Sequence, residues 1–284
     1  MGLVIGAAAL QALLYLLFSV FENRRIPLMP GIAVNYVVAM ILGLLYAPPW
    51  QAGDLSPLWL PSLGIGALFV VVFSLTGLTT QRSGVAASTV ASKMSVVLTV
   101  LFAVVVHHER PDLFAWLGLA VAMVSVVLVA SSAGREEQRT RWRLPLALFV
   151  GVACIDITIN AVQRFVLTPQ LEAVFPTLGL GFAGVFAMVH VLSGKDRKAL
   201  ASPSVWLWGG LLGLANYATL LFVVKALAHS GMAASTVFPL VSIFVILFGT
   251  AGSVFLFQEK VTTMQRIGIG CAVLALGLLM VAGT

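Results

Sequence analysis

The sequence is poor in charged residues, which make up 9% of its 284 positions, while apolar residues make up 60%. A soluble domain carries about 25% charged residues. The low charge therefore excludes an ordinary water-soluble fold and indicates a protein of the lipid bilayer. The basic residues lie mostly in the connections between apolar stretches. Membrane orientation therefore accounts for the formal net charge of +6, and we do not expect nucleic acid as a partner.

Several other signals are scarce or missing. The two cysteines, Cys154 and Cys271, lie inside apolar stretches and do not suggest a disulfide framework. The sequence has no GxxxxGK[ST] phosphate loop and no connection long enough for a soluble domain, so we do not expect ATP-driven pumping by this chain alone. His107-His108-Glu109 lacks further ligands at a useful spacing, so we expect no metal site and no other cofactor.

Ten apolar stretches are present, each near the ~20 residues that a helix needs to cross a bilayer. They are rich in leucine and alanine and do not alternate, which favours helices over strands. The sequence thus predicts an all-α, polytopic membrane protein with ten transmembrane helices. No basic segment precedes the first stretch, so we interpret it as a retained helix and not as a cleaved signal peptide. The stretches are residues 2–21, 30–48, 61–81, 84–107, 113–133, 144–167, 173–193, 205–228, 231–257 and 264–283.

One segment of the sequence occurs twice. Ser83–Val90 (SGVAASTV) and Ser230–Val237 (SGMAASTV) agree at seven of eight positions, 147 residues apart. Downstream, Glu109-Arg110 corresponds to Glu259-Lys260, 150 residues apart. The chain therefore contains an internal duplication, with two copies of one sequence unit.

Each half of the sequence contains five of the apolar stretches. We predict two five-helix repeats, residues 1–134 and 144–284, separated by the charged stretch 134–143. Because five is an odd number, the second repeat enters the membrane from the opposite side. Inverted repeats of this kind are common among secondary transporters, in which exchanging the conformations of the two halves gives alternating access to a site near the midplane.

With these features, the chain resembles the drug/metabolite transporter superfamily, EamA type. The resemblance rests on the five-plus-five helices, the SGxAAST segments, the Glu-Arg and Glu-Lys pairs, and the small residues at 118–122 and 268–272. It implies a multi-pass carrier of the inner (plasma) membrane, often an exporter of amino acids or related compounds. It also implies a central cavity between the halves and both termini inside the cell. Lys93 departs from the general family pattern.

Lys93 and Asp156 are the charged side chains that lie well inside apolar stretches. A charge there costs at least ~2.5–3.5 kcal/mol on insertion scales. Their helices run in the same direction, and their depths differ by only ~4–5 Å at ~1.5 Å per residue. We predict that they meet beside the substrate and engage opposite charges of a zwitterion. A purely structural ion pair is the alternative.

Polar residues at helical spacing extend this candidate site. Asp156, Asn160 and Gln163 share one helix face, and their counterparts in the first repeat are Tyr15, Ser19 and Glu22. The substrate-binding candidates are Lys93, Asp156, Asn160, Gln163, Tyr15, Ser19, Glu22, Tyr217 and Asn216, and the gating or hinge candidates are Ser88, Ser92, Ser235 and Pro239. We expect Glu109 and Glu259 to be structural, each accepting hydrogen bonds from the start of the helix that follows it.

The function that we expect is secondary transport of small polar or amphipathic metabolites, not enzymatic catalysis. The alternatives are a membrane-embedded enzyme acting on a lipid or isoprenoid carrier, and a passive channel. The expected partners are a small-molecule substrate and the bilayer; proton coupling and the choice between monomer and homodimer stay open. Twelve basic residues in odd-numbered connections against three near even-numbered ones place both termini outside, opposite to the family pattern.

Overall fold

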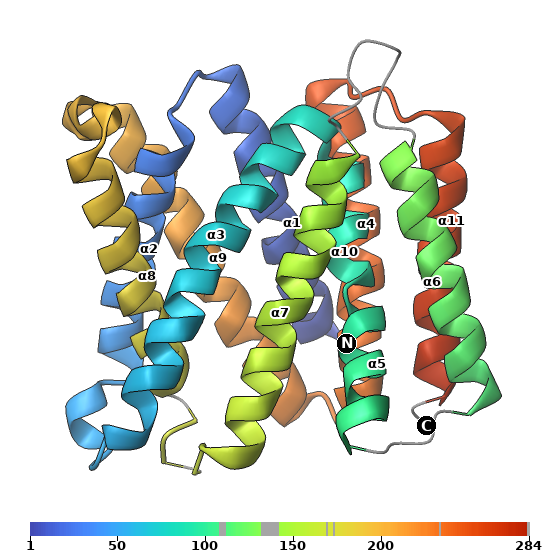
Figure 1. Ribbon diagram of the computed structural model, residues 1–284. Coiled ribbons are helices and arrows are strands. Elements are labelled where there is room, and N and C mark those ends of the chain that lie inside the picture. Colours follow the sequence, from blue (N-terminus) through green and yellow to red (C-terminus); the bar gives the residue numbers. More distant parts are fainter. Residues whose placement is uncertain (108–111, 132–141, 169, 173, 233, 283–284) are drawn as a thin grey trace. The chain divides into compact units, whose positions relative to one another are not determined.

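A computed structural model describes residues 1–284 except 108–111, 132–141, 169, 173, 233 and 283–284 (Figure 1). Every regular element in the described residues is helical. The elements are α1 Gly2–Asn23, α2 Leu28–Tyr46, η1 Pro49–Gln51, η2 Ser56–Leu58, α3 Trp59–Ser83, α4 Val85–Met94, α5 Val96–His107, α6 Leu113–Ser131, α7 Arg143–Phe165, α8 Val174–Ser193, η3 Lys195–Ala201, α9 Pro203–His229, α10 Ala234–Phe257 and α11 Thr263–Ala282.

The helices have the length and composition of membrane spans. Across the described ranges, nine segments are long and apolar enough to cross a bilayer, and Leu113–Val129 is a shorter apolar helix. These ten segments coincide with the ten stretches predicted from the sequence. The prediction of an all-α, polytopic membrane protein is confirmed.

One predicted helix is interrupted. The stretch 84–107 forms two helices, α4 and α5, which meet at Ser95; α4 and α5 lie one below the other in Figure 1. The expectation of a single continuous helix is wrong there. The stretch contains no proline, and its only glycine stands at its very start, so the usual breakers give no signal of the break.

Side chains cap two helix starts at equivalent positions of the duplicated sequence. The Asp112 carboxylate accepts a hydrogen bond from the Ala115 amide at 2.8 Å, at the start of α6. Before α11, the Thr262 amide donates to Gln265 Oε1 at 2.9 Å and the Gln265 amide donates to Thr262 Oγ1 at 3.2 Å. This reciprocal pair is a capping box. Since 112 + 150 = 262, the two caps are counterparts.

The duplicated segments also share a backbone feature. Gly84 has φ +90° and Gly231 has φ +71°. A backbone conformation with such a positive φ costs a residue with a Cβ about 1–3 kcal/mol. The two glycines stand at the same place in SGVAAST and SGMAAST, so both turns require glycine for the same reason.

The described chain divides into two compact units. Unit 1 comprises Met1–Ser19, Leu75–Ala153 and Ala218–Thr284, and unit 2 comprises Val20–Ser74 and Cys154–Tyr217. Each unit contains segments from both halves of the sequence. The compact units therefore differ from the two sequence repeats, and the repeat boundaries at 134 and 144 stay a prediction.

Within unit 1, α6 packs along α11 (Figure 1). A Cβ on Gly118 would lie 2.9 Å from Leu279 Cγ, and a Cβ on Gly268 would lie 2.6 Å from Val129 Cγ2. Adding 150 turns Gly118 into Gly268 and Val129 into Leu279, so the two contacts are reciprocal and the helices are antiparallel. Ser125 Oγ donates to the Gly268 carbonyl at 2.8 Å. Glycine at both positions allows this close approach.

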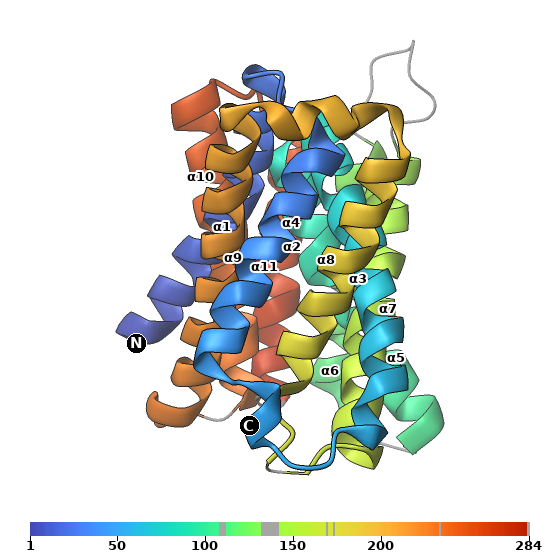
Figure 2. The same cartoon turned by 90° about the vertical axis from the view of Figure 1, so that its left-hand side faces the viewer.

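Within unit 2, α2 packs along α8 (Figure 2). A Cβ on Gly43 would lie 3.0 Å from Thr177 Cγ2, and a Cβ on Gly184 would lie 3.6 Å from Tyr36 Cβ. The later residue of α2, Gly43, thus meets the earlier residue of α8, Thr177, while Tyr36 meets Gly184. This pair is therefore antiparallel as well. Second-repeat helices thus pack against their first-repeat counterparts in both units.

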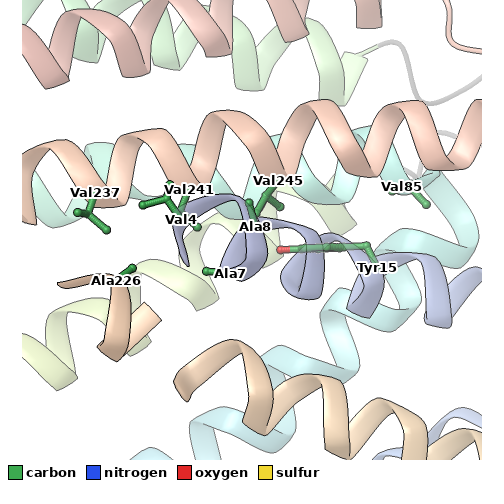
Figure 3. Close-up of a cluster of buried hydrophobic side chains, with 9 residues drawn as sticks. All are labelled: Val4, Ala7, Ala8, Tyr15, Val85, Ala226, Val237, Val241 and Val245. Atoms are coloured by element: carbon green, nitrogen blue, oxygen red, sulfur yellow. The ribbon is translucent and has the colours of Figure 1, made fainter. Parts of the chain in front are cut away.

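Each unit has its own apolar core. In unit 1, small residues of α1 face valines of α10, which lets the two helices approach closely (Figure 3). The residues of this cluster are Val4, Ala7, Ala8, Tyr15, Val85, Ala226, Val237, Val241 and Val245. The cluster of unit 2 consists of Leu58, Ile65, Val162, Leu171, Val174 and Phe175.

Candidate functional site

The break between α4 and α5 is built from hydroxyl side chains. Ser95 has φ −52° and ψ −24°, a tight helical turn, and its Oγ donates to the Ser92 carbonyl at 2.7 Å. The Leu98 amide then donates to the Ser95 carbonyl at 3.0 Å, which begins α5. A serine hydroxyl that bonds to a backbone carbonyl competes with the regular helical ladder. A bond of this kind lies at the break, where the sequence has neither glycine nor proline.

Lys93 lies in the last turn of α4, two residues before the break. A positive side chain is favoured at a helix C-terminus, where the carbonyl dipoles leave a partial negative charge. The side chain is half-buried. A transmembrane helix that ends inside an apolar segment, with a lysine in its last turn, is typical of the discontinuous helices that bind ions and substrates in transporters.

Tyr15 connects α1 to this break. Its hydroxyl donates to Ser92 Oγ at 2.9 Å. Both side chains are buried, with 4% and 8% of their surfaces exposed. Figure 3 shows Tyr15 beside valines and alanines of α1 and α10, so its hydroxyl is the polar atom of an otherwise apolar cluster. The structure thus brings together two predicted site residues, Tyr15 and Ser92, in unit 1.

The second repeat carries an irregularity at the corresponding place. Pro239 stands 147 residues after Ser92, inside α10. A proline has no amide hydrogen, so the carbonyl four residues before it loses its helical partner. Helix α10 packs on α4 in unit 1. Both counterpart segments therefore contain an irregular position, α10 at Pro239, the counterpart of Ser92, and the first repeat three residues later, at Ser95.

Polar residues of unit 2 form a second group. Asn216 Nδ2 donates to Asn35 Oδ1 at 3.3 Å, and Asn35 is fully buried. Nearby, a Cβ on Gly213 would lie 2.5 Å from the Asn35 carbonyl oxygen, so α9 approaches the backbone of α2 closely. Tyr217, another predicted site residue, is buried with 5% of its surface exposed.

The polar stripe of α7 is more accessible. Asp156 is half-buried, while Asn160 and Gln163 are exposed. Of the first-repeat counterparts besides Tyr15, Ser19 is half-buried and Glu22 is exposed. Asp156 belongs to unit 2 and Lys93 to unit 1. The predicted pairing of these two charges stays a prediction.

The predicted gating residues lie in α4 and α10. Ser88 is fully buried, and its Oγ donates to the Thr76 carbonyl of α3 at 3.4 Å. Ser92 bonds to Tyr15, and Pro239 is half-buried inside α10. The side chain of Ser235 lies outside the described residues.

The predicted role of Glu259 is wrong. We expected its carboxylate to cap the helix that follows, but Thr262 and Gln265 cap α11. Glu259 Oε2 instead accepts a hydrogen bond from the Val85 amide at 3.2 Å, at the start of α4. The partner is 174 residues away, so no local pattern in the sequence could indicate it. Glu109, the counterpart of Glu259, lies outside the described residues.

Comparisons with known proteins bear on the first half of the chain. Residues 1–131 match the model of the EamA-like transporter family. The resemblance found in the sequence is thus confirmed, and the EamA-like half includes Tyr15, Ser92, Lys93 and the break at Ser95.

Two further similarities extend over the whole length. The chain is 24% identical to an uncharacterised protein of Haemophilus influenzae over 269 residues, which covers 89% of this chain and 88% of that protein. It also resembles a protein known from a crystal structure, with a TM-score of 0.57 and 19% identity, covering 99% and 98% of the two chains. The latter likeness shows the fold alone. The overall fold is therefore similar to that of this solved protein over nearly the whole of both chains.

Proposed function

We propose that the protein is a secondary transporter, an exporter of small polar or amphipathic metabolites such as amino acids, that works by alternating access. The family match supports a transporter of the drug/metabolite type. We place it in the inner (plasma) membrane, on the strength of the family resemblance.

The break between α4 and α5 is the observation that carries this proposal. It sits inside the apolar span Val85–Phe102. The hydroxyls of Ser92 and Ser95 and the ammonium of Lys93 lie at the interruption. Placing polar groups inside a membrane span costs free energy, so such groups usually mark a functional site. Irregular backbone inside a span is likewise tolerated where it lines a cavity or pathway.

The chemistry of these residues favours a substrate with a carboxylate or another anionic group. Lys93 supplies a positive charge at the break, and Tyr15 and Ser92 supply hydroxyls beside it. Asp156, with Asn160 and Gln163 on the same helix, offers a carboxylate and amides for an ammonium group. A zwitterion such as an amino acid satisfies both sets.

The proposal is tested with purified protein in two steps. A thermal-shift screen against metabolites identifies compounds that stabilise the protein, because a ligand that binds only the folded state raises its melting temperature. Counterflow in proteoliposomes then measures saturable uptake of the best compound. Saturable counterflow supports a carrier; uptake that rises linearly with concentration indicates a passive channel and refutes the proposal.

Two matched tyrosine variants connect transport to the break. Tyr15→Phe removes the hydroxyl that bonds to Ser92, and we expect a half-saturation concentration higher by about threefold to tenfold, the worth of one hydrogen bond. Tyr36→Phe removes a hydroxyl of unit 2, which donates to the Phe69 carbonyl at 2.8 Å and makes no bond to Ser92. This control should keep the half-saturation concentration. Equal kinetics in the two variants would place the substrate elsewhere.

The enzyme alternative has a separate test. A membrane-embedded enzyme needs a nucleophile with a base, paired carboxylates or a metal cluster. In the described part of the chain, no three His, Cys, Asp or Glu side chains are grouped to hold a metal ion. Mass spectrometry of the stabilising compound after incubation with the protein distinguishes the classes, because a transporter returns the compound chemically unchanged.

A further inference from the structure

The carboxyl of Glu259 holds the start of α4 against the end of α10. Glu259 Oε2 accepts the hydrogen bond of the Val85 amide, one of the amides that a helix start leaves without an intrahelical partner. The other carboxyl oxygen, Oε1, occupies the place where a Cβ of Gly84 would stand. The absence of a side chain at position 84 therefore makes room for this carboxyl.

The backbone around Glu259 directs it toward α4. Gln258 has φ +55° and ends α10 in the left-handed region. The Glu259 amide then donates to the Ser253 carbonyl at 3.2 Å. Ser253 is fully buried, and its side chain also hydrogen-bonds to the Glu259 carboxyl. The backbone of Glu259 is thus fixed by the turn at Gln258, and its carboxyl is fixed by the hydrogen bond from Val85 of α4.

Hydroxyls without partners lie directly beside this contact. The last two turns of α3, which lead into Gly84, carry Thr79, Thr80 and Ser83, all buried. None of the three hydroxyls has a hydrogen-bond partner in the structure. Buried hydroxyls are nearly always paired, because leaving one unpaired costs free energy. Water would satisfy these three if the start of α4 moved away from α10.

The duplicated segment of the second repeat is in a different situation. Gly231, the counterpart of Gly84, is exposed, and no described atom lies within 4 Å of the place where its Cβ would stand. In the first repeat, Val85 and Ala86 are fully buried. Among the described residues, a carboxyl closes the first copy, whereas Gly231 of the second copy is exposed; Glu109, the counterpart of Glu259, lies outside the described residues. An alternating-access protein with inverted repeats shows this asymmetry in either of its two end states.

We propose that Glu259 is a latch that keeps the α4 start closed against α10, and that the latch holds more firmly when its carboxyl is protonated. This inference rests on the alternating access proposed above. When the start of α4 moves away from α10, the Val85 amide loses its hydrogen bond and the hydroxyls of α3 become exposed to water. The hydroxyl-lined end of α3 would then form the pathway on this side of the membrane.

The effect of pH follows from the surroundings of the carboxyl. Burial raises the pKa of Glu259, and the hydrogen bonds from Ser253 and Val85 lower it by less. In the open state the carboxyl meets water and its pKa returns to the ordinary range. The closed state therefore binds the proton more tightly, so closure is favoured at low pH and lost as pH rises through the raised pKa.

Other charged groups near the latch do not explain such a response. Arg82 at the end of α3, Lys260 next to Glu259, and Arg266 in the first turn of α11 are the charged residues of the flanking segments. Arginine and lysine side chains do not titrate in the range where carboxyl groups do. In the described residues Glu259 makes hydrogen bonds to Ser253 and Val85 but no ion pair.

Thiol labelling at Ser83 tests the latch without any substrate. Ser83→Cys is close to isosteric and buried when the latch is closed, in a background with Cys154→Ser and Cys271→Ser. Glu259→Ala removes the acceptor, and we expect the rate of maleimide labelling of the purified protein to rise about fivefold or more. Glu259→Gln keeps an acceptor and removes the charge, so its rate should stay at or below that of the Glu259 protein.

Two controls complete the experiment. Asp112→Ala removes a carboxylate that caps its own helix, so the labelling rate should not change. The ratio of rates between the Glu259 and Glu259→Gln proteins cancels the titration of the thiol itself, and it should rise as pH is raised from about 5 to about 8. If Glu259→Ala does not fold, this pH series decides.

An unchanged rate in Glu259→Ala, or a ratio that is flat or falls with rising pH, overturns the latch. A rate in Glu259→Gln as high as in Glu259→Ala overturns the role of the proton. Counterflow with the Glu259 protein is measured separately. If the labelling overturns the latch but counterflow is saturable, the proposal of a transporter is still supported. If uptake is linear, the proposal of a transporter is refuted, whatever the labelling result.

Discussion

Gly84→Ala is the substitution for which the structure allows the sharpest estimate. The alanine would have to adopt φ +90° with ψ 163°, a region almost confined to glycine, at a cost of about 1–3 kcal/mol. Its Cβ would also collide with Glu259 Oε1, so the carboxyl must leave and the hydrogen bond to the Val85 amide is lost. A hydrogen bond to a charged group is worth about 1.5–3 kcal/mol. We expect Gly84→Ala to destabilise the protein by the sum of the two terms, about 2.5–6 kcal/mol.

Gly231→Ala is the matched control, because Gly231 has φ +71° and no described atom near its Cβ position. It should cost only the backbone term, about 1–2 kcal/mol. The free energy of unfolding is measured by SDS titration in mixed micelles, with tryptophan fluorescence as the signal. The excess of Gly84→Ala over Gly231→Ala should be about 2 kcal/mol.

A double-mutant cycle isolates the collision. In a Glu259→Ala protein, Gly84→Ala meets no carboxyl and should cost only the backbone term. The two substitutions should therefore be non-additive by about 2 kcal/mol, as neighbours usually are. Equal costs for Gly84→Ala and Gly231→Ala, or additivity within the cycle, would refute the reasoning.

Three further predictions concern transport and orientation. Lys93→Ala and Asp156→Ala should each abolish counterflow, because in the predicted pair each substitution removes the partner of a charge inside an apolar helix; a Lys93→Met, Asp156→Leu protein that transports normally would remove both from the site. Ala87→Leu should jam one conformation, since Ala87 is fully buried at the start of α4; normal counterflow at normal expression would contradict this. A cysteine placed within residues 134–143 should resist labelling from outside intact cells, as the basic residues predict, and labelling there would reverse the orientation.

Much of the helix arrangement could be predicted from the duplication. The repeated SGxAAST segments lead into α4 and α10, the counterpart helices of the two repeats, and these helices pack on each other in unit 1. The glycines of α6 and α11 contact each other's helices reciprocally. Hydropathy alone sufficed for the ten spans, because a bilayer admits few solutions for a long apolar segment.

The break at Ser95 could not be predicted in the same way. The Ser95 hydroxyl donates to the Ser92 carbonyl at 2.7 Å at the break, but Ser253 makes the same kind of bond to the Thr250 carbonyl inside the continuous helix α10. Serine is common inside transmembrane helices and usually makes bonds that leave the helix intact. Only the surrounding tertiary structure, including the bond from Tyr15 to Ser92, decides that this serine interrupts the helix.

The role of Glu259 was missed for a different reason. Its position just before a helix favours a local cap, and Thr262 with Gln265 gives an equally good local cap three residues later. The sequence contains both signals and cannot rank them. The long-range partner, Val85, becomes visible only when the turn at Gln258 is seen to direct the carboxyl toward α4.

The reciprocal contact of α6 with α11 has a consequence for the origin of the chain. Gly118 of α6 meets Leu279 of α11, and their counterparts Gly268 and Val129 meet in the same way. The contact surface of this helix is therefore complementary to that of an inverted copy of the same helix. A single five-helix ancestor, inserted in both orientations, would have met its own copy across this seam as an antiparallel homodimer. Fusion of two such genes would fix one orientation for each half. Each half could then diverge, as the proline of α10 and the serine break after α4 already show.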